Sequence, residues 1–411
     1  MTAQRRRSPF AAVRPAVGLA AAYAVALAVW LVAGNGLPGG RWFAVHLFTL
    51  GVLSNLVMAM TQHFSETLLH QPGSSWSLAR GALFNAGVLA VLVGMPARQS
   101  WLVAAGATAA SAAVLWLYVQ LRRVRKAALS QRFAFLVRTY ERATGAFLHG
   151  AILGALVGTG VLPGAWAGTA RLAHLHVNIL GWGGLTLLST LVVFGPTVMR
   201  ARMEPAADET AARWLRRGAT GLTIGVIAIL LSAAPGLWGL AARLVGAAGL
   251  AVYAGACLAV CRPVLTAARR AKISANGLLL AAVCVWFPLV AAVDVLAVAT
   301  GRMWLLTALG AGTLVGVLGQ AILATIGYLG PMLWSDVDRR AGLRQRLDAA
   351  PRTRTAVLNA GVLCIVVGTG ARAGTLASAG WVLVGVAVAA FLALAASTAV
   401  AKVQKPEANS L

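Results

Sequence analysis

Apolar runs of about 20 residues recur along the whole chain, and each is long enough to cross a bilayer core about 30 Å thick. The chain has 411 residues, of which 59% are hydrophobic and only 11% charged. Twelve runs follow one another, at about residues 12–34, 43–62, 81–97, 101–120, 143–162, 172–198, 218–233, 237–260, 274–299, 303–333, 355–371 and 377–400. No polar stretch between them suits a soluble domain. The sequence therefore predicts an all-α polytopic membrane protein, with residues 1–411 in a single membrane domain.

The net charge of +25 is distributed unevenly over the predicted loops. One side carries only Arg41, Arg98, Arg171, Arg243, Arg302 and Arg372. The other side holds the remaining Lys and Arg, in clusters at Arg5–Arg7, Arg122–Lys126, Arg200–Arg217, Arg262–Lys272 and Arg339–Arg354. This pattern obeys the positive-inside rule. It predicts a multi-pass protein of the cytoplasmic (plasma) membrane with both termini in the cytoplasm.

The basic residues also bear on the partners of the chain. They anchor loops next to the predicted spans and form no patch with interleaved aromatic residues. A nucleic-acid partner is therefore excluded, and membrane lipids are the predicted surroundings.

The runs fall into three groups of four, at approximately residues 12–120, 143–260 and 274–400. The pattern H-x-x-x-L-G occurs at residues 46–51 of the second run and at residues 176–181 of the sixth. A Gly-Pro pair ends the sixth and tenth runs, at residues 195–196 and 330–331. Aligning these pairs puts Leu309 and Ala311 at the positions of His174 and His176. We interpret the chain as three four-helix repeats, the third without a histidine.

Five of the six histidines fall on two segments, at residues 46–70 and 174–196. Unpaired imidazole is costly in hydrocarbon, so this concentration needs a cause. His46, His174 and His176 all come near the outer ends of their runs. Residues two apart on a helix point about 200° from each other, so His174 and His176 cannot both face His46. The repeat favours a His46–His176 pair, with His174 in another pocket or at the lipid interface.

Two imidazoles from facing helices are suitable axial ligands for a b-type haem. A copper ion is the competing cofactor, because imidazole suits it equally well. The alternative without a cofactor is that these histidines only form hydrogen bonds at the membrane interface.

Three four-helix units with histidines on the second and sixth spans resemble the catalytic subunit (subunit I) of the haem-copper oxidases and its NnrS-like relatives. The string HLHVNILGWGG at residues 174–184 is similar to the His-x-His-x-x-x-x-Gly helix of nitric oxide reductases and oxidases. In that family the two histidines of such a pair ligate two different haems. The string HLFTLG at residues 46–51 is similar to the segment of the second helix in that family whose histidine ligates the low-spin haem.

The chain also departs from that family. It has no His-His pair, no histidine follows His176, and its His-x-His segment lies on the sixth span, where oxidases carry it on the tenth. The resemblance therefore implies a haem or copper site on a related scaffold, without the binuclear centre that reduces oxygen.

A second group of polar residues is predicted near the cytoplasmic side. His63 and His70 are one heptad apart, and Glu66 lies between them on the same helix face. These three side chains, with His149 as a fourth ligand, would suit one divalent metal ion. The alternative is an amphipathic helix end with solvated polar groups.

Asp294 is the one carboxylate deep inside a later run, and an intramembrane acid is a candidate for a proton or ion relay. A structural pairing with Arg302 or with a neighbouring helix is the alternative. Cys257 and Cys261 share a helix face that would suit a soft metal ion, or they are buried structural thiols.

The sequence thus predicts a membrane protein that binds haem b or copper, meets a redox partner and acts in electron transfer or in nitric oxide or copper stress. Two alternatives remain. One is a transporter of metal ions or small solutes that uses His63, Glu66, His70 and Asp294. The other is a scaffold that has lost its cofactor and serves as a partner subunit.

Overall fold

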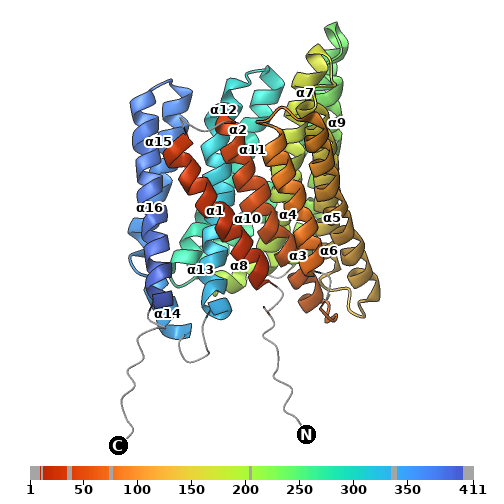
Figure 1. Cartoon of the computed structure of the whole chain (residues 1–411). Helices are drawn as coiled ribbons and strands as arrows, with labels where there is room; N and C mark the ends of the chain where they lie inside the picture. Colours follow the sequence, from red (N-terminus) through yellow and green to blue (C-terminus); the bar gives the residue numbers. More distant parts are fainter. Residues whose placement is uncertain are drawn as a thin grey trace, which may run out of the picture. The chain divides into compact units, whose positions relative to one another are not determined.

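The computed structural model describes residue 10 and residues 13–34, 39–73, 77–202, 206–334 and 340–400. Over these residues the chain forms helices and no β-strand (Figure 1). The basic stretch Arg5–Arg7 and both chain ends lie outside the described residues. The predictions of a plasma membrane and of cytoplasmic termini stay predictions.

Within the described ranges, eleven helical segments are long and apolar enough to cross a membrane. They are α1 (Arg14–Ala33), α2–η2–α3 (Gly40–Leu68), α4 (Ser77–Gly94), α5 (Ser100–Ala127), α7–η3–α8 (Gly164–Met199), α9 (Ala207–Leu231), α10 (Gly236–Arg270), α11 (Ala275–Thr300), α12–η4–α13 (Trp304–Trp334), α15 (Pro351–Gly370) and α16 (Gly374–Val400). A further long helix, α6 (Ala134–Gly158), is more polar because its first half carries Arg138, Glu141 and Arg142. The predicted all-α polytopic membrane fold is confirmed. The short helix α14 (Arg340–Leu347) was not predicted.

The helices group into two compact units. Unit 1 comprises Met1–Thr190 and Ala212–Tyr253, and unit 2 comprises Leu191–Ala211 and Ala254–Leu411. Each unit is described by itself below, and the single membrane domain stays a prediction.

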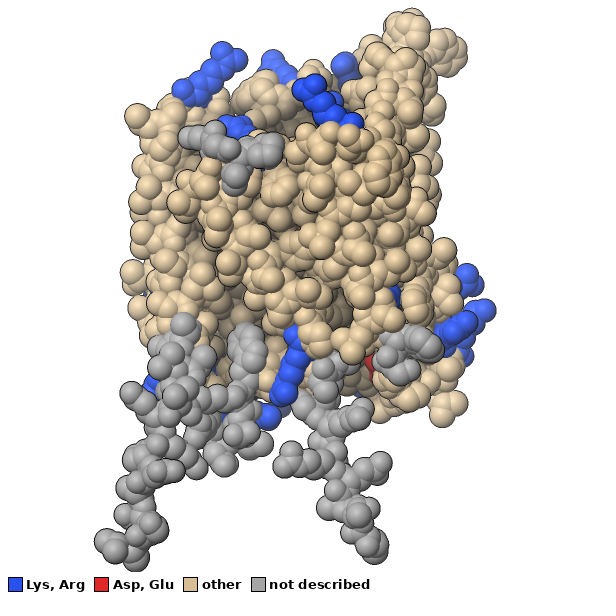
Figure 2. All heavy atoms as spheres, in the orientation of Figure 1, with Lys and Arg blue, Asp and Glu red and all other residues tan. Residues whose placement is uncertain are grey.

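Apolar side chains cover the outer faces of the long helices. Leu31 of α1, Leu115 of α5 and Leu392 of α16 are each about half exposed or more. In water such surfaces would be sites of aggregation, whereas in a bilayer they face lipid. On the face that Figure 2 shows, the Lys and Arg side chains lie almost entirely at the helix ends. The charge distribution therefore fits helices that cross a membrane.

Three of the long segments contain a stretch of π-helix, in which the backbone hydrogen bonds connect residues five apart. The stretches are η2 (Leu47–Leu53), η3 (Val177–Leu185) and η4 (Gly312–Gly319). They begin directly after His46, His176 and Ala311. These are the three positions that the sequence alignment makes equivalent, so the structure agrees with the predicted repeat.

A glycine inside each π-helical stretch lies against the first helix of its own repeat. The contacts are Gly51 with Tyr23 of α1, Gly181 with Ala146 of α6 and Gly316 with Trp286 of α11. A Cβ at any of the three would lie closer to that neighbour than ordinary van der Waals contact allows. Glycine is needed here because the helices approach closely.

The third and fourth helices of each repeat also pack through glycines. The facing pairs are Gly87 with Gly106, Gly221 with Gly249, and Gly361 with Gly380. Helix association in lipid depends on such close backbone contact, because the hydrophobic effect does not drive two apolar helices together there.

Gly87 allows a direct test of this packing. An added Cβ would lie 2.6 Å from the backbone nitrogen of Ala110 and from the carbonyl oxygen of Gly106. Neither backbone atom can move without shifting its helix, so Gly87→Ala should destabilise the folded protein by about 1–3 kcal/mol. The measurement is a denaturant or thermal unfolding curve in detergent. Gly81→Ala on the same helix is the control, since nothing lies within 4 Å of its added Cβ. Equal stability of the two variants would contradict this packing.

The first and third repeats each contain a pair of hydrogen-bonded side-chain amides, buried in the first and partly buried in the third. In the first repeat, Asn55 and Asn85 donate to each other's side-chain oxygen at 3.1 and 2.9 Å. In the third, Gln320 and Asn359 do the same at 3.0 and 3.1 Å. Asn55 and Gln320 each follow a π-helix glycine by four residues and also bond its carbonyl oxygen. These pairs connect the second and third helices of their repeats.

Candidate metal centre

His46 is the last residue of α2 (Gly40–His46), and its ring is held by Trp42 one turn earlier. Its Nδ1 lies 2.8 Å from the carbonyl oxygen of Trp42. The indole of Trp42 stacks on the imidazole, with ring centroids 4.2 Å apart. Because a carbonyl oxygen only accepts, Nδ1 carries the hydrogen. In the neutral ring, Nε2 therefore carries the lone pair that a metal ion needs.

His174 lies in α7 (Gly164–His176) and is fixed by the neighbouring helix α6. Its Nδ1 donates to the carbonyl oxygen of Gly150 at 2.8 Å. A Cβ on Gly154 would collide with the imidazole, so this glycine lets the ring lie against α6. Asn178 donates to the carbonyl oxygen of His174 at 2.8 Å. The hydrogen on Nδ1 again places the lone pair on Nε2.

The rings of His46 and His174 are stacked near-parallel to each other in unit 1. Their centroids are 6.3 Å apart, and their planes differ by 16°. A bond from imidazole nitrogen to a transition metal is about 2 Å long, and each ring centre lies about 1 Å behind Nε2. Two imidazoles on opposite sides of one metal ion therefore have centres about 6 Å apart. The centroid separation is of the size that a shared metal ion requires, and both tautomers leave Nε2 as the nitrogen that could bind it. Ligating histidines commonly donate their other nitrogen in this way.

His176 has a different environment from His174, as two positions on one helix require. It is fully buried, and its Nδ1 donates to the carbonyl oxygen of Leu172 at 2.7 Å. The repeat makes His176 the equivalent of His46, but the ring that lies beside His46 is that of His174. The predicted His46–His176 pair stays a prediction.

The four residues of the predicted divalent-metal site lie in different environments. His63 packs its ring against Phe10, with centroids 4.8 Å apart. Glu66 is buried and accepts from Gln62 at 2.8 Å. His70 is exposed and has a left-handed backbone, with φ of 54°. His149 is exposed on α6 and donates to the carbonyl oxygen of Gly145 at 2.8 Å.

Among the residues that the structure describes, no three His, Cys, Asp or Glu side chains form a group that could hold a metal ion. The divalent-metal site predicted at His63, Glu66, His70 and His149 therefore stays a prediction.

A buried cluster of charged and polar side chains on α3 and α4 was not predicted from the sequence. Arg80, at the start of α4, is 2% exposed and donates to the side-chain oxygen of Gln62. Gln62 in turn donates to Glu66, which is 8% exposed. Arg80 had been counted as one of the loop cations. The position of Arg80, three residues inside the apolar helix α4, is the sequence feature that would have indicated a buried arginine.

Asp294 and the cysteines lie on helices of unit 2. Asp294 is 6% exposed on α11, which agrees with its predicted place inside a span. Its predicted role as a proton or ion relay is untested. Cys257, Cys261 and Cys284 are buried and are not disulfide-bonded in the described part of the chain. They remain candidates for structural thiols.

The chain was compared with models of protein families and with curated proteins. No family model matches it, and no curated protein gives a match. The geometry described above therefore carries the functional argument.

Proposed function

We propose that this integral membrane protein binds a redox-active metal centre, haem b or a copper ion, through His46 and His174, and acts in electron transfer or in the response to nitric oxide or copper. The observation that carries the proposal is the near-parallel His46–His174 pair, whose centroids are 6.3 Å apart. Both Nδ1 atoms are engaged by carbonyl oxygens, which leaves both Nε2 atoms for the metal.

The surrounding residues support the same use of the pair. Trp42 holds the His46 ring, and Gly150 fixes the rotation of His174. Arg41 near the start of α2 and Arg171 one turn before His174 in α7 are exposed, and they would supply positive charge for the carboxylates of a haem. When bound by the two imidazoles, the group would supply one-electron transfer. A redox partner would then deliver or accept the electron.

The resemblance of the two histidine segments to haem-copper oxidases and NnrS-like proteins adds to the proposal. The lack of an adjacent His-His pair anywhere in the sequence argues against a copper site of the oxidase type beside a haem. We therefore propose electron transfer or stress response rather than reduction of oxygen.

The test is a spectrum and a metal analysis of protein purified in detergent. Reduced-minus-oxidised difference spectra should show a Soret band and α-band of a six-coordinate b-type haem, or copper should be present at about one ion per chain. Protein purified without the group is titrated with haemin and, separately, with Cu(I). A chain that takes up neither would refute the proposal.

A further inference from the structure

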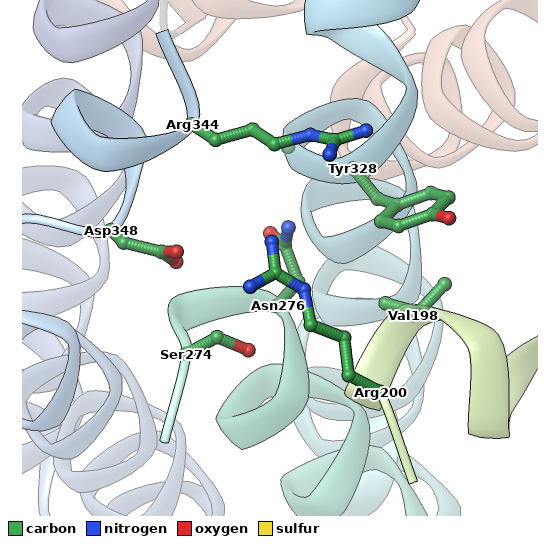
Figure 3. A pocket seen from close by; sticks show the side chains of 8 residues that line it. Val198, Arg200, Ser274, Asn276, Tyr328, Arg344 and Asp348 are labelled. Carbon is green, nitrogen blue, oxygen red and sulfur yellow. The ribbon is translucent and has the colours of Figure 1, made fainter. Parts of the chain in front are cut away.

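A polar hollow opens at one end of unit 2, apart from the histidine pair. It is lined by Val198, Arg200, Ser274, Asn276, Gly327, Tyr328, Arg344 and Asp348. These residues come from the end of α8 (Thr186–Met199), the start of α11, the last half of α13 (Gln320–Trp334) and from α14 with the residue after it. Four chain segments that are distant in sequence thus bring their polar side chains to one place (Figure 3).

Two arginines dominate the charge of this hollow. Figure 3 shows the guanidinium groups of Arg200 and Arg344 approaching it from different elements, with Asp348 at the opposite edge. No ion pair or hydrogen bond of either guanidinium occurs within the described part of the chain. Arg344 lies over the ring of Tyr328, 5.8 Å from its centroid, and its Nε is buried without a hydrogen-bond partner. A buried donor without a partner costs about 1–3 kcal/mol, so the guanidinium of Arg344 has donor capacity that the described part of the chain does not use.

The neutral groups of the hollow are also suited to an anion. Ser274 caps α11 and accepts from the backbone nitrogen of Gly277 at 3.1 Å, which leaves its own hydroxyl hydrogen to donate. Asn276 lies beside Arg200 in the hollow and adds an amide donor. The start of a helix of 26 residues adds the positive end of its dipole.

Asp348, the one carboxylate among the described lining residues, already has a structural role. Asp348 accepts from the backbone nitrogen of Ala275 at 2.9 Å, and so ties the residue after α14 to the first residue of α11. The described residues that line the hollow thus include two guanidinium groups and one carboxylate, and their net charge is positive.

We propose that this hollow is a binding site for the phosphate group of an anionic ligand, either an acidic phospholipid headgroup or a free phosphate. Guanidinium groups bind phosphate oxygens through paired, parallel hydrogen bonds. The hollow lies at the end of unit 2 that carries the basic segments 262–272 and 340–354, which the positive-inside rule places at the cytoplasmic leaflet. Basic pockets between membrane helices on that side commonly bind phosphorylated lipid headgroups.

The experiment uses the full chain in phosphatidylcholine nanodiscs. In one arm, phosphatidylglycerol or phosphatidic acid is added and bound lipid is counted by native mass spectrometry. In the other, inorganic phosphate is titrated into lipid-free detergent micelles and binding is measured by calorimetry. Arg200→Gln and Arg344→Gln should each weaken binding about tenfold, the loss expected for one charge-assisted contact. Arg346→Gln is the matched control, because Arg346 is exposed on the same helix α14.

The results of the two binding arms support or overturn the proposal in the following way. Binding of both ligands, sensitive to Arg200 and Arg344, supports a phosphate site. Binding in the lipid arm alone supports a headgroup as the natural source, and binding in the micelle arm alone supports a soluble phosphate. No binding in either arm, or an equal loss with Arg346→Gln, overturns the proposal. Unchanged thermal unfolding of the variants shows that the loss is not a failure to fold.

Discussion

A His174→Gly variant is expected to lose the bound haem or copper, whereas a His176→Gly variant should keep it. The reason is geometric, since the ring of His174 lies 6.3 Å from that of His46 and the two planes are near-parallel. Without one imidazole, the affinity for the metal centre should fall by at least a hundredfold. The measurement is the Soret absorbance or the copper content per chain of the two variants, purified in the same way as the wild type.

Added imidazole provides a check that a folding defect cannot imitate. It should enter the space left in His174→Gly and restore the spectrum, because only the side chain has been removed. His149→Gly is the matched control, since His149 is an exposed histidine on the neighbouring helix α6. If His176→Gly lost the metal centre and His174→Gly retained it, the pairing suggested by the repeat would replace the one proposed here.

The helices could be predicted from the sequence because each apolar run must satisfy its backbone hydrogen bonds within itself in lipid. The hydrophobic stretch 303–333, for example, corresponds to a helical segment from Trp304 to Trp334. The interior of that segment could not be predicted. A π-helical stretch such as Gly312–Gly319 leaves composition and hydropathy unchanged, so only the backbone geometry reveals it.

The contact between His46 and His174 could be predicted from the sequence only in part. Spacing shows that His174 and His176 face different directions, but it does not say which of them faces His46. That choice depends on the rotation of α7 about its axis, which the contact of His174 with Gly150 fixes. The glycines at 150 and 154 form a small-xxx-small pattern and would have indicated where α7 approaches α6.

Replacing Arg80 with methionine should destabilise the protein by about 3 kcal/mol or more. The guanidinium is 2% exposed and reaches Glu66 through Gln62. Removing it leaves the carboxylate of Glu66 buried without that positive charge. A buried charge that loses its nearby countercharge is costly for this reason, while methionine replaces most of the volume of the arginine stem. The measurement is the free energy of unfolding in detergent, compared with Arg123→Met, which removes an exposed arginine of α5.

A second substitution separates charge from packing. In the double variant Arg80→Met, Glu66→Gln, no carboxylate remains to be compensated, and the new amide can still accept from Gln62 at the position of the former oxygen. Stability should therefore recover by more than half of the loss seen in Arg80→Met. If the double variant were as unstable as the single one, the role of Arg80 would be to fill space between α3 (Ser54–Leu68) and α4. Its charge would then have no part in stabilising this end of unit 1.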